Sequence, residues 1–217
     1  LAVFLLAPLA IALSLIVARI ARRRRRGVVR QSPTDPVPVI VVGNLVAGGA
    51  GKTPIAIAIA RELARRGHRP GLIAGGYRAS NDRAQLVDQD SAAATVGDEA
   101  LLLARETGLP VASGRLRAEA LARLLAAHPA IDVVISDDGL QHVPLARRVE
   151  IVVLDDRGLG NGWCLPAGPL REPVDRLETV DFVVRNRNTS AGRVGGRGAA
   201  RRVESDAVAP PGAQLIF

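Results

Sequence analysis

The stretch "VPVIVVGNLVAGGAGKTPIAIAIARELARRG", residues 37–67, decides the fold of this chain. It opens with a continuous run of apolar, mostly β-branched residues over 37–44, which predicts a buried strand. A glycine-rich turn follows, and residues 53–67 then place apolar side chains at helical spacing until Gly67 ends the pattern. A strand, a glycine-rich loop and a helix in this order are typical of a phosphate-binding loop.

Lys52 closes the glycine-rich loop, and it is the only lysine among the 29 Lys and Arg residues of the chain. A compact ammonium on a flexible stem suits the β- and γ-phosphates of a nucleotide, and the hydroxyl of Thr53 suits Mg²⁺. Val46 stands where the standard pattern has its first glycine, so the loop fits a GGxGKT variant. We therefore predict a nucleoside triphosphate and Mg²⁺ as cofactors, with the nucleotide bound by Gly48, Gly49, Ala50, Gly51, Lys52 and Thr53.

The rest of the chain alternates short apolar runs with helical patterns. Strands are expected over 69–76, 131–138, 149–156 and 180–186, and helices over 98–107 and 115–128. This alternation predicts a P-loop NTPase-like α/β fold, a three-layer α/β/α arrangement with a mostly parallel sheet. The expected units are an N-terminal apolar helix with a basic segment (1–30), a nucleotide-binding domain (31–186), and a linker or incomplete remnant of a second lobe (187–217).

Residues 1–18 carry no charge, and seven arginines follow within 19–30. A secretory signal has its positive charges before the apolar stretch, so this order disfavours one. Eighteen helical residues reach about 27 Å, just short of the ~30 Å bilayer core, and Pro8 weakens a regular span. We expect a membrane-associated helix. Crossing the bilayer and lying in its interface, with arginines on anionic headgroups, both stay open, as does a buried core helix.

The net charge of +8 does not indicate a nucleic-acid partner. The basic excess sits in two short tracts, 19–30 and 185–202, while residues 31–184 carry 16 basic and 19 acidic side chains. Three Phe, one Tyr and one Trp leave few rings on which bases could stack. The single cysteine, Cys164, excludes an internal disulfide.

A second motif, "DVVISDDGLQH" (132–142), places Asp137 and Asp138 at the carboxyl end of a predicted strand. Ligands of doubly wound folds bind at this end, so one aspartate is a candidate to orient Mg²⁺ and the other to assist. The alternative is that the pair only forms a turn. His142 is a candidate contact to substrate or nucleotide, and equally a structural residue.

Two further segments carry candidate residues. In "VGDEALLLARETG" (96–108), Asp98 and Glu99 begin a predicted helix, where they suit either capping and the helix dipole or a general base that accepts a proton from a hydroxyl. The loop "LGNGWCLPAGPLREP" (159–173) is rich in Gly and Pro and carries Arg171 and Glu172, so we expect it to shape a site.

Together and in this order, these segments resemble the tetraacyldisaccharide 4′-kinase family of Gram-negative bacteria. The resembling stretches are "VPVIVVGNLVAGGAGKTP", "VGDEALLLA", "SDDGLQHVPLARRVEIVVLD" and "GNGWCLPAGPLREP". The resemblance implies a P-loop kinase at the cytoplasmic face of the inner membrane. Its substrates would be ATP and the 4′-hydroxyl of a tetraacyldisaccharide 1-phosphate, a lipid precursor of lipid A.

The resemblance also implies roles for single residues. Asp98 becomes the candidate base, and Lys52 and Asp138 further catalytic residues. The implied metal-site residues are Thr53, Asp137 and Glu172. The candidate substrate contacts are Glu99, His142 and Arg171.

The chain departs from the family pattern at Ala74–Arg78, where SRGYG is usual, and at Arg147–Arg148, where RD is usual. The resemblance is expected to end near residue 186, so the chain is expected to be C-terminally truncated. Two alternatives follow, an inactive ATP-binding fragment of the kinase and a membrane-bound nucleotide-switch ATPase. No NKxD motif is present, which disfavours GTP.

Overall fold

The computed structural model describes residues 2–76 and 83–186, with side chains from residue 7 onward. Within these residues, seven strands form one sheet in the order β3-β4-β2-β5-β1-β6-β7, and every pair is parallel except β3 with β4. The strands are β1 (Val39–Gly43), β2 (Pro70–Ala74), β3 (Gln85–Val87), β4 (Val111–Ser113), β5 (Val133–Asp137), β6 (Val149–Leu154) and β7 (Phe182–Arg185). The expected mostly parallel α/β sheet is confirmed.

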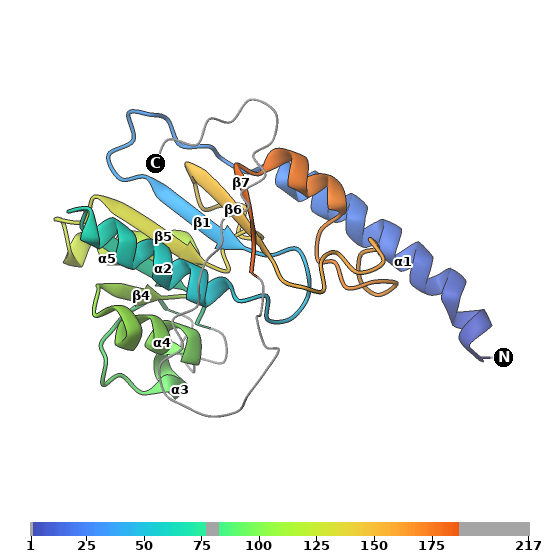
Figure 1. Cartoon of the computed structure of the whole chain (residues 1–217), viewed down its shortest axis with the longest axis horizontal. Helices are drawn as coiled ribbons and strands as arrows, with labels where there is room; N and C mark the ends of the chain where they lie inside the picture. The colour runs from blue at the N-terminus through green and yellow to red at the C-terminus, as the bar shows by residue number, and fades with distance from the viewer. Residues whose placement is uncertain (1, 77–82, 187–217) are drawn as a thin grey trace.

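Helices cover both faces of this sheet (Figure 1). One face packs against α2 (Lys52–Arg65), α3 (Ala93–Val96) and α4 (Asp98–Thr107). The opposite face packs against α5 (Arg117–Ala127). Alternate residues of β1 serve the two cores, because successive side chains of a strand point to opposite faces: Val41 lies in one cluster and Val42 in the other.

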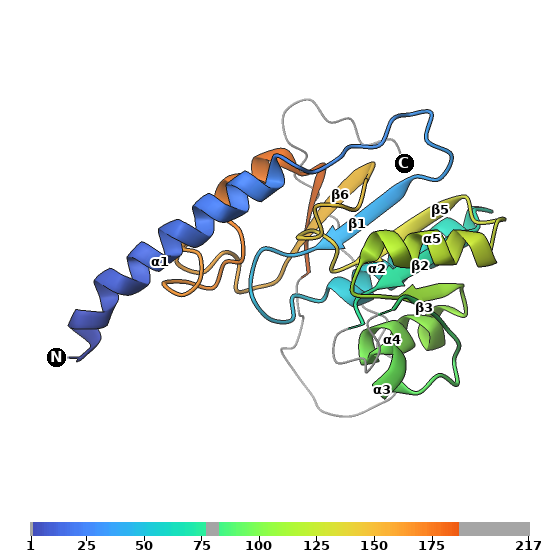
Figure 2. The ribbon, with the colours of Figure 1, turned by 180° about the vertical axis from the view of Figure 1, so that it is seen from behind.

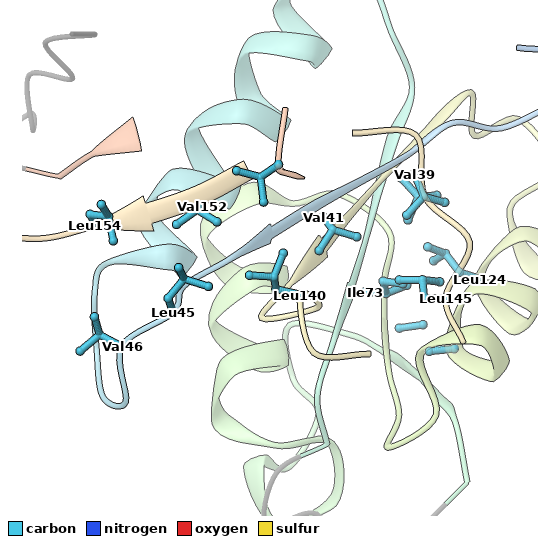
Figure 3. Packing of buried hydrophobic residues seen from close by; sticks show 14 of the residues in the cluster. Val39, Val41, Leu45, Val46, Ile73, Leu124, Leu140, Leu145, Val152 and Leu154 are labelled. Atoms are coloured by element: carbon cyan, nitrogen blue, oxygen red, sulfur yellow. The ribbon is translucent and has the colours of Figure 1, made fainter. Parts of the chain in front are cut away.

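The core on the α5 face reaches from the sheet into the loops at its carboxyl edge. Figure 3 shows Val41 and Val152 from the strands near Leu140 and Leu45, which belong to loops that follow strands. Leu45 and Leu140 are fully buried or nearly so. Apolar packing therefore holds the loops that carry the candidate site residues.

The helix α1 (Ala2–Arg25) projects from the sheet, and the 3₁₀ helix η1 (Val174–Thr179) lies beside it (Figures 1 and 2). The Ser14 hydroxyl donates a hydrogen bond to the Cys164 carbonyl oxygen at 2.7 Å, and Arg22 pairs with Asp175 of η1 at 2.8 Å. Several large apolar side chains of α1 stay exposed, namely Leu9, Ile11, Leu13, Leu15, Ile16 and Ile20. Within the described part of the chain, no helix has both the length and the hydropathy needed to cross a membrane.

Arg147 is fully buried and binds backbone carbonyl groups of the loop that precedes it. Its guanidinium donates to the carbonyl oxygens of Leu140 (3.1 Å), His142 and Leu145 (2.9 Å). It also pairs with the buried carboxylate of Glu150 at 3.2 Å. Arg147 therefore stabilises the conformation of the loop after β5 through hydrogen bonds to three of its carbonyl groups.

The structure confirms the strands predicted by apolar runs and the helices predicted by helical spacing, and it adds four short elements, β3, β4, α3 and η1. Each of these has three to six residues and lacks a continuous run of β-branched residues. The predicted domain boundaries stay predictions, and residues 187–217, expected to form a linker or remnant, lie outside the described residues.

Gly43 allows the end of β1 and the loop after β5 to approach closely. A Cβ atom at Gly43 would lie 2.5 Å from the Leu140 Cβ, whereas one at Gly49 would meet nothing within 4 Å. We expect Gly43→Ala to lower the free energy of unfolding by about 1–3 kcal/mol, as overpacking does. Gly49→Ala, the matched control, should leave it nearly unchanged. Urea unfolding followed by circular dichroism measures both, and equal stabilities would contradict the packing described here.

Candidate functional site

The loop between β1 and α2, residues 44–51, is braced by its own first side chain. The Asn44 amide nitrogen donates to the carbonyl oxygens of Val46 (2.6 Å) and Gly48 (3.2 Å). Gly51 has a φ of 78°, a left-handed conformation that favours glycine, and it precedes the first residue of α2. The loop is thus shaped by hydrogen bonds before any ligand binds.

A second segment of the chain packs against this loop. The Ala47 N–H donates to the Pro169 carbonyl oxygen at 2.8 Å, and the Arg171 N–H donates to the Leu45 carbonyl oxygen at 2.6 Å. The expectation that the 159–173 segment shapes a site agrees with this pairing. Two side chains that the sequence did not single out bind the far end of the loop: Arg157 donates to the Gly49 carbonyl oxygen at 2.9 Å, and Asn186 to that of Ala50 at 3.2 Å.

Lys52 is the first residue of α2 and is buried. Its Nζ donates to the Asn44 Oδ1 at 3.2 Å and forms an ion pair with the Asp138 Oδ1 at 3.3 Å. The ammonium therefore sits at the positive end of a helix, where an anion is favoured. Its partner Asn44 belongs to the loop of residues 44–51, so the ammonium lies beside that loop.

Thr53 and Asp137 meet at the carboxyl end of the sheet. The Thr53 hydroxyl donates to the Asp137 Oδ2 at 2.7 Å, while the buried Asp137 Oδ1 has no hydrogen-bond partner. The pKa of Asp137 is raised to about 6, and burial is the main cause; the bond from Thr53 and the charge of Lys52 act to lower this pKa, and the charges of Glu99 and Asp138 act to raise it. A buried carboxylate oxygen without a partner is costly and calls for a cation.

The chemistry of this pair fits Mg²⁺ held together with a nucleotide. Mg²⁺ prefers oxygen ligands and is usually bound through one or two protein side chains plus substrate phosphates. No cluster of three or more His, Cys, Asp or Glu side chains suited to a metal occurs in the described residues. The Thr53 hydroxyl and the free oxygen of Asp137 are the groups that would hold the ion, and their metal role stays a prediction.

Glu172 has other partners. Its Oε1 accepts a hydrogen bond from the Gln141 Nε2 at 2.8 Å, and its Oε2 pairs with Arg176 at 3.3 Å. Its predicted metal role stays a prediction. In this structure the Glu172 carboxylate forms an ion pair with Arg176.

Asp138 follows β5 with a φ of 48°, and no other non-glycine residue among those described has a positive φ. Its carboxylate lies between two cations, Lys52 and Arg171, the latter at 3.2 Å. Non-glycine residues in this region of φ are uncommon and tend to occur at functional sites. The structure thus brings together three predicted residues, Lys52, Asp138 and Arg171.

Asp98 and Glu99 begin α4 and are exposed. Gly97 occupies the N-cap position and no side chain caps the helix, so the capping interpretation of Asp98 was wrong. The charge of Glu99 acts to raise the pKa of both Asp137 and Arg117, so Glu99 lies near enough to influence these two residues of the site. The role of Asp98 as a base stays a prediction.

His142 is half-buried, and burial together with the charges of Arg117 and Arg147 lowers its pKa to about 4. The imidazole is therefore neutral at physiological pH, and any contact to substrate would be a hydrogen bond from a neutral ring.

The sequence did not single out Arg117, the first residue of α5. Its buried guanidinium donates to the carbonyl oxygens of Gly114 (2.9 Å) and Asp137 (3.3 Å). A Cβ atom at Gly75 would lie 2.8 Å from its Nη2, so the missing side chain at that position makes room for it. Burial lowers the pKa of Arg117, while Asp138, Asp137 and Glu99 counter this. Nothing in its spacing distinguishes Arg117 from the other arginines.

A cavity of about 300 Å³ lies beside the site, between α1 and the segments that follow β5 and β6. Its lining combines apolar side chains with four arginines, one glutamine and one glutamate. The lining includes Val17, Ile20, Ala21, Val28, Leu140 and Val143, and also Arg24, Arg25, Gln141, Arg171, Glu172 and Arg176.

Comparison with known proteins gives a consistent result. Residues 2–209 match the family model described as tetraacyldisaccharide-1-P 4′-kinase, so the expectation that the resemblance ends near residue 186 was wrong. The tetraacyldisaccharide 4′-kinase of Dechloromonas aromatica is 58% identical over 151 residues, 70% of this chain and 45% of that protein. That of Acidovorax ebreus is 47% identical over 208 residues, 96% of this chain and 61% of that protein.

A solved structure is similar as well. LpxK from Aquifex aeolicus, determined in complex with ATP, superposes with a TM-score of 0.70 at 29% identity, over 80% of this chain and 56% of that one. The chain thus spans about half the length of the relatives that it matches. By the family match over residues 2–209, the chain belongs to the tetraacyldisaccharide-1-phosphate 4′-kinase family.

Proposed function

We propose that this chain transfers the γ-phosphoryl group of ATP to the 4′-hydroxyl of a tetraacyldisaccharide 1-phosphate in lipid A biosynthesis. The observation that carries the proposal is the buried Lys52 at the start of α2, next to the Thr53–Asp137 pair. Family membership and the ATP-bound relative support it.

Phosphoryl transfer depends mainly on positioning and on neutralisation of charge. The Lys52 ammonium would leave Asp138 and bind the β- and γ-phosphate oxygens. Thr53 and Asp137 would hold Mg²⁺, which supplies positive charge to the phosphates. Asp98, exposed at the start of α4, would accept the proton of the 4′-hydroxyl. Arg171, which already contacts Asp138 at 3.2 Å, would bind the acceptor or the transferred group.

The cavity beside Arg171 suits an acceptor that is both apolar and anionic. Side chains of α1 provide half of its apolar residues, and four arginines, two of them from α1, provide positive charge. A phosphorylated disaccharide with acyl chains combines these two properties. The cavity therefore supports the lipid class of the acceptor.

We further propose that α1 lies in the interface of the inner membrane, at its cytoplasmic face. Exposed apolar side chains along α1 and the arginines that follow them support this, because such helices bind anionic membranes through both features. The acyl chains of the acceptor would then stay in the bilayer while its sugar reaches the edge of the sheet.

Replacement of Lys52 tests the proposed transfer. We expect Lys52→Arg to lower transfer of γ-³²P from Mg-ATP to the tetraacyldisaccharide 1-phosphate about a hundredfold, although the charge is kept, because a planar guanidinium cannot replace a point charge at this place. Asp98→Asn should lower transfer similarly while ATP binding persists. Arg61→Lys on the exposed face of α2 is the control. Full activity of Lys52→Arg would contradict the role of the ammonium, and ATP binding without transfer by the unaltered chain would identify a nucleotide-binding fragment.

The raised pKa of Asp137 predicts a proton that is linked to ligand binding. Because folding raises this pKa from 3.8 to about 6, the protonated carboxyl stabilises the ligand-free fold below about pH 4, and this contribution is lost as the pH rises through about 6. Mg-ATP requires the carboxylate, so binding at pH 6, where about half of the Asp137 carboxyl groups are protonated, should release about half a proton per molecule. Calorimetry in two buffers of different ionisation enthalpy measures this release. It should vanish in Asp137→Asn and persist in the exposed control Asp90→Asn; unchanged release in Asp137→Asn would refute the assignment.

The apolar face of α1 predicts binding to anionic vesicles. We expect the triple replacement of Leu9, Leu15 and Ile16 by serine to weaken flotation with phosphatidylglycerol vesicles at least about tenfold, because each side chain contributes about 1.5–3 kcal/mol when buried. Leu116→Ser is the matched control, since Leu116 is equally exposed but lies on the body of the protein. Equal flotation of both variants would exclude this face as the membrane contact.

A further inference from the structure

A line of polar contacts leads from η1 to Lys52. Arg176 of η1 is buried, and its Nε lies 3.3 Å from the Glu172 Oε2. The other oxygen of Glu172 accepts a hydrogen bond from the Gln141 Nε2 at 2.8 Å. The same amide nitrogen lies 3.2 Å from the Asn44 carbonyl oxygen and donates to it. The Asn44 side chain in turn accepts from the Lys52 Nζ at 3.2 Å.

The far end of this line is firmly held. The Arg176 Nη2 donates to the buried Glu150 carboxylate at 2.6 Å, and its Nη1 donates to the Thr179 hydroxyl at 2.8 Å. Glu150 is also paired with the buried Arg147. Arg176 therefore has a fixed place, from which it attracts the Glu172 carboxylate as an ion pair, although its Nε makes no hydrogen bond to that carboxylate.

Each step depends on the one before it because the charged members and Asn44 are buried, and Gln141 between them is partly buried. Without Arg176, the Glu172 carboxylate would lack its cation, and a buried charge without a partner moves toward water or takes up a proton. Gln141 would then lose its charged acceptor and with it the orientation that supports Asn44. Asn44 is fully buried and also braces the phosphate loop, so its displacement would move both the loop and the ammonium.

We propose that Arg176 is a positioning residue for Lys52, acting through Glu172, Gln141 and Asn44. This inference rests on the proposed function, in which Lys52 binds the phosphates of ATP. It gives Glu172 a task that needs no metal, in contrast to the metal-site role implied by the resemblance.

The single lysine makes a direct test available. Labelling the full chain with ¹³C,¹⁵N-lysine yields side-chain signals from Lys52 alone. We expect Arg176→Gln and Gln141→Leu to shift the Lys52 Cε and Nζ signals in the ligand-free chain, and to weaken ATP binding about tenfold, the low end of the cost of losing an outer partner of a charged site. The weakening should be equal in Mg²⁺ and in EDTA.

The matched control is Thr179→Val, which removes a bond of the same guanidinium on the side away from Glu172. It should leave the Lys52 signals and the ATP affinity unchanged. Circular dichroism shows whether each variant is folded; if Arg176→Gln is not, Gln141→Leu decides, since it leaves the Arg176–Glu172 pair intact. Lys52 signals in folded Gln141→Leu that superpose on those of the unaltered chain would overturn the inference. Failure of the unaltered chain to bind ATP would refute the proposed function instead, since the ligand-free signals still report the positioning.

Discussion

The parallel pairing of β1 with β5 is the constraint on which the rest of the site depends. Its register sets Val42 beside Asp137, so the phosphate loop leaves one strand where the carboxylate ends the other. The start of α2 then brings Thr53 within 2.7 Å of Asp137. A slip of one residue would turn Asp137 to the opposite face of the sheet. The apolar cores on both faces thus determine where the polar groups meet.

The site also depends on how charged groups are paired at the carboxyl edge of the sheet. Two cations, Lys52 and Arg171, flank the single carboxylate of Asp138 at the edge of the sheet. Asp137 differs, because it has a hydroxyl donor but no cation in direct contact, and burial therefore raises its pKa. The buried Asp137 carboxylate thus lacks a cation, while the neighbouring Lys52 ammonium can bind a ligand in addition to Asp138. This imbalance is what a cation–nucleotide pair would relieve.

Much of this arrangement could be predicted from local pattern. The apolar run before Gly43 and the helical pattern after Thr53 predicted β1 and α2, and the strand ending at Asp137 predicted the partner carboxylate. The pattern did not predict β4, because three residues carry no period, nor the task of Arg117, because its place depends on the bare backbone of Gly75. The partners of Glu172 depend on side chains from two other segments. Contacts of this kind follow from tertiary packing and leave no trace in spacing.

Arg147 shows how differently the parts of this region respond to acid. The loop after β5 is held largely by hydrogen bonds from this guanidinium to backbone carbonyl oxygens, and neither a guanidinium nor a carbonyl changes its protonation in mildly acidic solution. The carboxyl group of Asp137, at the end of the strand before this loop, does take up a proton there. Mild acid would therefore switch off the chemistry of the site while the scaffold keeps its shape. On the proposed function, activity would therefore be lost at a higher pH than the structure of this loop.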